Sequence, residues 1–368
     1  MPADLTGGLD PGRDFYLPQR PEHPEMKESA SVWVSDDEGR FGFPRLCVEA
    51  ISHHWHEHGI EANFAYPDGR VFVGHGPGTA HETVAADGQP RILGAGPLRF
   101  ETVEPFKHLR VTYDGEMRET TVADQARKAP LGPAKRFQFE IDCMAAAPPI
   151  EYGALTEEGR RRMMADGPES ASMGAGGGHR FEQLFLARGR LKVAGQAEVA
   201  FKGRGLRIRR TGVRNTAGLT GHVWMSTVFP SGKAFGLTAF APQPDGTVGF
   251  NEGYIYEHGR IVPVTQVQAP WLTEFTPNGA PCDLVLQTAE GRRVTIQGVT
   301  NEATCIPPGG CMFGAWTHYG LARNFYHQGG ALYTWDGESA YGMIERSLRP
   351  EKVRLNLLEG RPMAVSFA

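Results

Sequence analysis

The sequence lacks a long hydrophobic run, an excess of charge of one sign and a recognisable cysteine framework. Its five cysteines are odd in number and show no Cys-x-x-Cys spacing, which favours reduced thiols over disulfides. No stretch approaches the roughly 18 apolar residues that cross a bilayer, and the first thirty residues hold no apolar segment of a signal peptide. We therefore expect a soluble, cytoplasmic protein without a membrane span.

The charge balance and the missing motifs exclude several classes of function. The chain has 38 Lys and Arg residues against 42 Asp and Glu residues, whereas a nucleic-acid-binding protein usually carries a basic excess. There is no Walker motif and no Gly-x-Ser-x-Gly nucleophile elbow, and Gly203-Arg204-Gly205 lacks the third glycine of a dinucleotide site. We expect no nucleic-acid partner and no cofactor.

Glycine and proline predict the fold class. The 47 glycines and 27 prolines make up about a fifth of the 368 residues, which disfavours long helices. Turn-forming pairs such as Asp68-Gly69, Asp114-Gly115 and Asp336-Gly337 recur beside β-type runs. This spacing predicts an all-β protein of antiparallel barrels or sandwiches. One short helix is expected over residues 157–165, with Thr156 as its cap.

Composition also suggests a division of the chain. The stretch 145–178 differs from its surroundings because it combines an Ala-Pro-rich segment, the expected helix and a glycine-rich run. We therefore expect an extended N-terminal arm (1–30), a first β domain (31–144), a linker with the short helix (145–178) and a second β domain (179–368) that carries the binding pocket.

A histidine-rich segment at residues 53–58 suggests one alternative. On a strand, His54 and His56 would project from the same face, and Glu61 follows at a distance that a cupin-like metal site tolerates. The competing interpretation is the polar end of a hairpin, with the strand ending near His56 and a turn at residues 57–59. We favour the hairpin, so no metal site is predicted.

The order of motifs in the second half suggests a family. A Glu-Gln strand precedes a segment in which Gly203, Gly205, Arg207, Arg209, Gly212 and Arg214 match a Gly-x-Gly-x-Arg-Asp-(His/Arg)-Ser-Trp-Gly-x-Arg pattern in register. This order resembles the lipocalin-like superfamily of carotenoid 1,2-hydratases (hydroxyneurosporene synthases) and kievitone hydratases, with its uncharacterised bacterial relatives. The resemblance implies two lipocalin-like β-barrels or sandwiches packed together, a lipophilic substrate and no obligatory cofactor.

The sequence departs from the family pattern at a chemically important position. Ile208 stands where the family has Asp, and Arg210-Thr211 replace Ser-Trp. The family's acid/base carboxylate is therefore missing, so either another acid serves or the fold performs a different reaction.

Several residues could supply the missing chemistry. Arg207 and Arg209 would share one face of a strand, and buried guanidinium groups need carboxylates, for which Glu182, Glu252 and Glu345 are the expected partners. Such pairs could equally be structural salt bridges between strands. The predicted catalytic residues are Glu182, Tyr254, His318 and Tyr319, and the predicted substrate-binding residues are Arg207, Arg209, His179, His222, Trp224 and Trp316.

We expect a cofactor-independent lyase of the hydratase or elimination type, or an isomerase or cyclase. It would act by general acid/base catalysis on a hydrophobic aromatic (phenylpropanoid-like) or terpenoid small molecule. Two alternatives stay open, a non-catalytic carrier of lipophilic ligands and a cupin-like metal enzyme. A homodimeric assembly also stays open.

Overall fold

The protein is an all-β molecule, which confirms the fold class expected from the sequence. The computed structural model describes residues 4–151, 153, 155–157, 161, 180–213, 220–242, 251–310 and 322–357. A six-residue helix, α1 (Val122–Arg127), begins after Thr121, whose side chain accepts a hydrogen bond from the backbone N–H of Asp124. Of the helix expected over 157–165, only Glu157 and Arg161 lie among the described residues, and both are helical.

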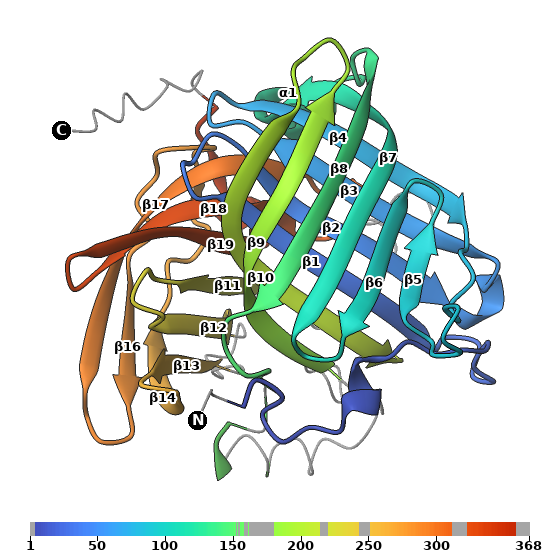
Figure 1. The fold of residues 1–368 in the computed structure, drawn as a ribbon. Helices are drawn as coiled ribbons and strands as arrows, with labels where there is room; N and C mark the ends of the chain where they lie inside the picture. Colours follow the sequence, from blue (N-terminus) through green and yellow to red (C-terminus); the bar gives the residue numbers. More distant parts are fainter. Residues whose placement is uncertain are drawn as a thin grey trace.

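The first sheet has ten strands in the order β4-β3-β2-β1-β10-β9-β8-β7-β6-β5, and an additional β4–β7 pairing closes eight of them into a ring. We call this ring the first barrel (Figure 1). The strands of the ring are β1 (Lys27–Asp36), β2 (Gly42–Ile51), β3 (Glu57–Ala65), β4 (Arg70–Thr79), β7 (His108–Thr121), β8 (Ala134–Ala145), β9 (Arg180–Val193) and β10 (Val199–Gly212). Strands β5 (Ile92–Ala95) and β6 (Leu98–Glu104) extend the sheet beyond β7.

The second sheet closes on itself in the order β11-β12-β13-β14-β16-β17-β18-β19, and we call it the second barrel. Its strands are β11 (Gly221–Val228), β12 (Ala234–Phe240), β13 (Asn251–Glu257), β14 (Arg260–Gln268), β16 (Leu284–Thr288), β17 (Arg293–Ile306), β18 (Phe325–Trp335) and β19 (Glu338–Leu348). Two further short strands, β15 (Glu274–Phe275) and β20 (Arg354–Leu355), pair in parallel.

The chain passes from the first sheet to the second between β10 and β11. Strands β9 and β10 follow the linker expected at 145–178, yet they pair with β8 and β1 and so complete the first barrel. The division between the sheets therefore falls later in the chain than the change in composition. The strand that carries the family-like motif belongs to the first barrel, where one of its faces turns to the interior and the other to the second barrel.

The predicted turns are largely where the sequence places them. Gly69 and Gly337 have φ values of 88° and 78°, which glycine adopts without the steric cost of a Cβ atom. Asp114-Gly115 is an exception, because this pair lies inside β7 and is paired with Gln138 and Phe137 of β8. The expected turn there is wrong, since the register of the long β7–β8 ladder runs straight through it.

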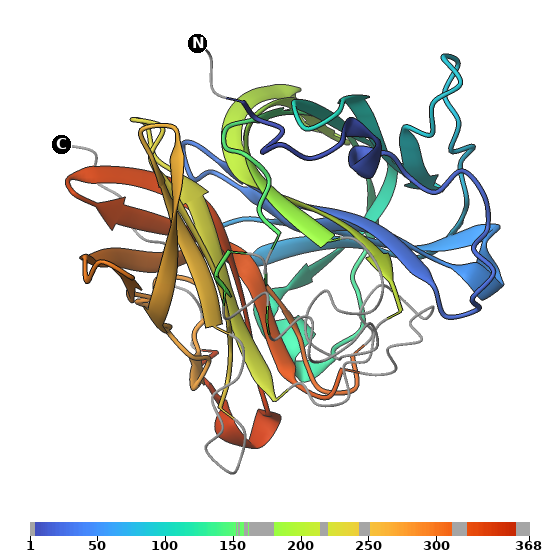
Figure 2. The same ribbon diagram turned by 90° about the horizontal axis from the view of Figure 1, so that it is seen from below.

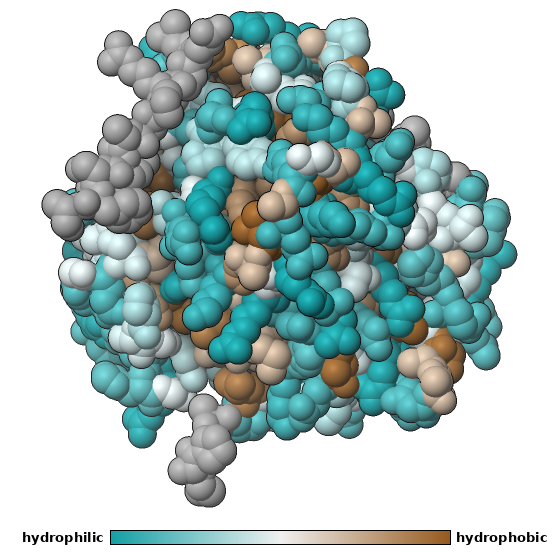
Figure 3. Space-filling model, turned by 45° about the horizontal axis from the view of Figure 1, so that its top comes forward, coloured by the Kyte–Doolittle hydropathy of each residue, from teal (hydrophilic) through white to brown (hydrophobic). Residues whose placement is uncertain are grey.

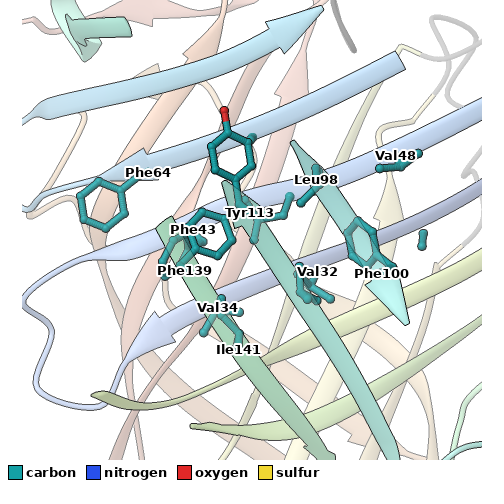
Figure 4. Close-up of a cluster of buried hydrophobic side chains, with 14 of the residues drawn as sticks. Val32, Val34, Phe43, Val48, Phe64, Leu98, Phe100, Tyr113, Phe139 and Ile141 are labelled. Carbon is teal, nitrogen blue, oxygen red and sulfur yellow. The ribbon is translucent and has the colours of Figure 1, made fainter. Parts of the chain in front are cut away.

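Each barrel has its own apolar interior. In the first barrel, alternate residues of each strand point inward, as in Phe43 of β2, Phe64 of β3 and Phe139 of β8, whose rings pack together (Figure 4). The second barrel is filled in the same way by residues such as Phe235, Tyr333 and Ile344.

The face of the molecule in Figure 3 is mainly hydrophilic, with hydrophobic side chains scattered over it.

The outer faces of the two barrels pack against each other. A third hydrophobic cluster combines Trp33, Leu206 and Ile208 of the first barrel with Trp224 and Tyr254 of the second. Figures 1 and 2 show β9, β10 and β1 beside β11, β18 and β19. No helix among the described residues is long and apolar enough to cross a membrane.

Candidate active site between the two barrels

The candidate site lies where strands of the two barrels face each other, and strand alternation decides which residues reach it. On β10, Arg207 pairs with Val32 of the first core, so its neighbour Ile208 points outward. Glu182 of β9 is directly opposite Ile208 and shares that outward face. On the second barrel, Trp224 of β11 is directly opposite Glu345 of β19.

Glu182 is buried at this contact and joins both barrels. Only 1% of the residue is exposed. Its Oε2 atom accepts a hydrogen bond of 3.0 Å from the indole Nε1 of Trp224, and its Oε1 atom pairs with the guanidinium of Arg180. Burial raises the pKa of Glu182 to about 7, although Arg180 and Trp224 oppose that rise. A carboxyl group with this pKa can both donate and accept a proton near neutral pH.

Arg45 occupies an irregular part of β2. The pairing of β2 with β3 shifts register between Gly42 and Leu46, and Arg45 within this bulge has φ of 76°. A positive φ is costly for a residue with a long side chain, so the surrounding structure must hold this conformation. The bulge aims the guanidinium at the outer face, where it lies 5.4 Å above the Trp33 ring.

Two carboxyl groups from different barrels flank Arg45. Its Nε atom lies 3.5 Å from Oε2 of Glu61 on β3, and its Nη1 atom lies 3.8 Å from Oε2 of Glu345 on β19. Burial raises the pKa of Glu61 above its ordinary value. Burial would also raise the pKa of Glu345, but the hydrogen bond from His222 and the charge of Arg45 lower it overall. The pKa values of the two carboxyl groups therefore shift in opposite directions.

A chain of hydrogen bonds continues from Glu345 through His222. Oε1 of Glu345 lies 3.1 Å from His222 Nε2, and His222 Nδ1 lies 2.7 Å from the Ser347 hydroxyl. Because an ionised carboxylate only accepts, Nε2 carries the proton and Nδ1 accepts from Ser347. Gln328 donates to Oε2 of Glu345 at 3.0 Å. These contacts fix the imidazole orientation, as a histidine in proton transfer requires.

An aromatic pair connects the two charged groups. The Trp33 and Trp224 rings meet edge to face with centroids 5.1 Å apart. Trp224 contacts Glu182, while Trp33 lies beneath Arg45. Glu182, Trp224, Trp33, Arg45, Glu61, Glu345 and His222 thus form one continuous group, which we call the inter-barrel cluster.

Several buried polar atoms on the same faces have no hydrogen-bond partner among the residues that the structure describes. They include the indole nitrogen of Trp33 and side-chain oxygens of Ser226, Thr238 and Gln328. Buried polar groups in proteins are nearly always paired, and exceptions concentrate at sites with another purpose. Donors and acceptors are therefore available beside the inter-barrel cluster for the polar parts of a small molecule.

Arg207 and Arg209 point into the first barrel, away from the inter-barrel cluster. Arg207 makes a bidentate pair with Asp14 at 3.1 and 2.9 Å, and Arg209 pairs with Glu28. Arg209 also lies 4.7 Å from the Tyr16 ring. Their carboxylate partners are therefore not the expected Glu182, Glu252 and Glu345, because β10 alternation turns both arginines inward. They hold the segment around residues 10–17 against the end of the first barrel (Figure 2).

Four of the predicted site residues meet at the contact between the barrels. Glu182 and Trp224 are hydrogen-bonded, His222 shares the outward face of β11 with Trp224, and Tyr254 belongs to the same hydrophobic cluster as Trp224. Burial and the charge of Glu182 raise the pKa of Tyr254. The other predicted residues, His179, Trp316, His318 and Tyr319, lie outside the described residues.

The residues considered for a cupin-like metal site do not converge. His54 ends a short 3₁₀ turn (Ser52–His54), the His56 side chain is 80% exposed, and Glu61 faces Arg45. Among the described residues, no group of three or more His, Cys, Asp or Glu side chains could hold a metal ion. The turn expected at 57–59 is also displaced, because β3 already begins at Glu57.

Sequence reasoning missed the role of Arg45 and considered Glu61 only as a metal ligand. Arg45 reaches the site through a bulge, and no residue pattern in this stretch of the sequence predicts that bulge. Glu345 was considered only as a partner for Arg207 or Arg209. Its outward direction follows from strand alternation, but its contact with Arg45 depends on how the barrels pack.

Solved structures share this fold. An AttH-like protein from Nitrosomonas europaea superposes with a TM-score of 0.52 at 13% identity, covering 90% of this chain and 98% of its own. CghA gives 0.51 at 11% identity, covering 89% and 88%, and CghA with Sch210972 gives 0.50 at 11% identity, covering 94% and 97%. Kievitone hydratase from Nectria haematococca gives 0.49 at 11% identity, covering 95% and 96%.

At these identities the similarity to the AttH-like protein and to CghA establishes the fold alone, which is the two-barrel fold that the resemblance in motif order implied. No curated protein matches the chain. Residues 14–349 match the family model described as "Domain of unknown function (DUF7064)", so the chain belongs to that family.

Proposed function

We propose that the protein is a cofactor-independent lyase or isomerase that acts by general acid/base catalysis on a hydrophobic small molecule. The substrate would bind at the contact between the barrels, and its class would be an aromatic, phenylpropanoid-like compound or a terpenoid. The Ile208 side chain on this face replaces the acid expected from the family pattern, so the proton chemistry falls to other residues.

One observation carries the proposal: Arg45 lies between two buried carboxyl groups whose pKa values shift in opposite directions. A pair of this kind assigns the acid and the base. Glu61, whose pKa is raised, would donate a proton to the substrate. Glu345, whose pKa is lowered, would orient His222 as the base. His222 would take the proton of the Ser347 hydroxyl at Nδ1 as that hydroxyl oxygen accepts one from the substrate, and Arg45 would stabilise negative charge that develops on a substrate oxygen.

Glu182 would be a second acid/base group at the other end of the inter-barrel cluster. Its pKa of about 7 and its position beside the apolar residues Ile208 and Tyr254 support proton transfer to a carbon skeleton. The similarity to CghA, a structure of which contains Sch210972, supports the binding of an organic molecule by this fold.

The test uses the purified full chain and a panel of aromatic alkenes, terpenoid polyenes and their hydrates, incubated in H₂O and D₂O. Mass spectrometry would detect gain or loss of one water, or exchange of hydrogen for deuterium without a change of formula. We expect turnover of at least one compound, and a decrease of roughly 100-fold or more in Glu61→Gln and Glu345→Gln.

Glu28→Gln is the matched control, because Glu28 is also a buried carboxyl with a raised pKa but faces the interior of the first barrel. It should retain turnover within about twofold when compared at equal folded fraction. If every panel compound that binds is recovered unchanged and without deuterium, the protein is a carrier and the catalytic proposal is wrong. Undiminished turnover in both Gln variants would also remove Glu61 and Glu345 from the mechanism.

A further inference from the structure

A second unusual arginine lies inside the second barrel. Arg346 of β19 is directly opposite Val223 of β11, which belongs to the second core, so its side chain points inward. Only 3% of the residue is exposed. It alternates with Glu345, which points outward to the inter-barrel cluster, so the two neighbours in sequence serve opposite faces of the same strand.

Arg346 differs from the other buried arginines. Arg180, Arg207 and Arg209 each pair with a carboxylate, and Arg45 pairs with two. Arg346 makes no ion pair with any described residue. Its hydrogen bonds go to neutral acceptors, the Nδ1 atom of His327 at 3.1 and 3.4 Å and the carbonyl of Pro270 at 3.4 Å. A buried cation without a counter-charge is costly unless something else neutralises it.

The neighbouring groups cannot supply that negative charge. Burial raises the pKa of the Cys282 thiol to about 12 and raises the pKa of the Tyr333 phenol, so both are neutral at pH 7. His327 is fully buried, and burial and the charge of Arg346 lower its pKa, so it is neutral as well. Because its Nδ1 accepts from Arg346, its Nε2 carries a hydrogen, and that buried donor has no partner in the described part of the chain.

The surroundings of the two residues are apolar. The connection between β14 and β16 contributes Pro270, Leu272 and Phe275, and the Phe275 ring lies 5.4 Å from that of His327. The same cluster includes residues of β17, β18 and β19, among them Ala303, Cys305, Phe325 and Leu348, and residues of β3, β4 and α1, among them Val71 and Val122. An arginine with N–H groups to spare at the edge of an apolar cluster matches a ligand with a carboxylate head and an apolar body.

We propose that Arg346, held in place by His327, forms an anion-binding site inside the second barrel for the carboxylate of an apolar organic acid. Arg346 supplies the charge and the N–H groups of its Nη1 and Nη2 atoms that are not used by Pro270 and His327, and His327 holds the guanidinium in place through its Nδ1 atom. The site is separate from the inter-barrel cluster and does not depend on the catalytic proposal, which concerns the opposite face of β19.

The experiment measures binding of matched pairs of probes to the full chain, octanoate against 1-octanol and benzoate against benzyl alcohol. Calorimetry and the shift of the melting temperature are read together, since a ligand that binds the folded state raises that temperature. We expect the carboxylates to bind and to raise the melting temperature more than the alcohols do. Arg346→Met should bind the carboxylates at least about tenfold more weakly.

The unliganded variant gives a second readout. A purely structural arginine would cost stability when replaced. In Arg346→Met the removal of a buried charge without a counter-charge should offset the loss of the hydrogen bonds to His327 and Pro270, so the melting temperature should stay nearly unchanged. Arg260→Met removes an exposed charge at the start of β14 and should keep the carboxylate preference.

Equal binding of acids and alcohols by the natural protein overturns the proposal, as does a carboxylate preference that persists in Arg346→Met. If that variant does not fold, Arg346→Gln is measured in its place, and a persistent preference there overturns the proposal in the same way. Loss of the preference in Arg346→Gln supports it. Glu61→Gln should bind octanoate like the natural protein, which separates this site from the catalytic one.

Discussion

Trp224 donates its indole N–H to the Glu182 carboxyl group across the contact between the barrels, at 3.0 Å. The donor comes from β11 of the second barrel and the acceptor from β9 of the first, so neither barrel can form this part of the site alone. The same indole meets Trp33 edge to face. Barrel packing and the electrostatics of Glu182 are therefore coupled through one side chain.

Replacement of Trp224 by Phe should raise the pKa of Glu182 above about 7, because the lost hydrogen bond favours the ionised form. The variant should also lose about 1–3 kcal/mol of stability. Infrared titration of the protonated carboxyl band, taken as the difference from Glu182→Gln, measures the pKa. Trp335→Phe, in the core of the second barrel, should lose stability without moving that pKa. An unchanged titration in Trp224→Phe would contradict the coupling.

Glu182 should also make stability depend on pH. Its pKa is about 7 in the folded protein against an ordinary 4.5, so the folded state keeps a proton that the unfolded state releases. This contribution is fully present below pH 4.5 and is lost as pH rises to 7, for a total of about 3 kcal/mol at most. Urea unfolding at several pH values should therefore show the natural protein losing stability relative to Glu182→Gln across this window. A difference that is constant with pH would refute the raised pKa.

The general fold could be predicted because its causes are local. Glycines after Asp or Glu mark hairpins, and alternating side chains mark strands, so an all-β protein follows from short stretches of sequence. The exception at Asp114-Gly115 shows the limit, since a long ladder of paired strands overrides a local turn signal. The division between the barrels could not be read from composition, because β9 returns to β8 after the 145–178 segment.

The site was predictable only in part. Glu182, His222, Trp224 and Tyr254 were chosen for their chemistry, and the packing of the barrels brings them together. The partners of Arg207 and Arg209 were not found, because Asp14 lies 193 residues before Arg207 and its arrival depends on how the N-terminal segment folds back. The position of Arg45 in the site could not be predicted, because it depends on a bulge that is fixed by the β2–β3 register.

The buried pair between Asp14 and Arg207 should contribute to stability. In Asp14→Ala the guanidinium is left without its counter-charge inside the first barrel, and the free energy of unfolding should fall by roughly 3 kcal/mol or more. Combining Asp14→Leu with Arg207→Met should recover much of the loss, because no unpaired charge is then buried. Glu104→Ala, which breaks an exposed pair with Lys107, should cost no more than about 1 kcal/mol. A similar loss in Asp14→Ala and Glu104→Ala, by urea unfolding, would contradict this interpretation.

Gly205 of the family-like motif should tolerate no side chain. A Cβ atom there would lie 1.8 Å from the backbone carbonyl oxygen of Trp33 on the neighbouring strand, and backbone cannot rotate away as a flexible side chain can. Gly205→Ala should force β10 from β1 and destabilise the protein by about 3 kcal/mol. Because Trp33 lies beneath Arg45, the change should also disturb the inter-barrel cluster. The near-ultraviolet circular dichroism of the Trp33–Trp224 pair would show this disturbance.

Gly12→Ala, whose nearest neighbour is the exposed Asp10 side chain, should leave both stability and spectrum nearly unchanged. If Gly205→Ala behaved like Gly12→Ala, the motif glycine would have no packing role, and its match to the family pattern would need a different physical explanation.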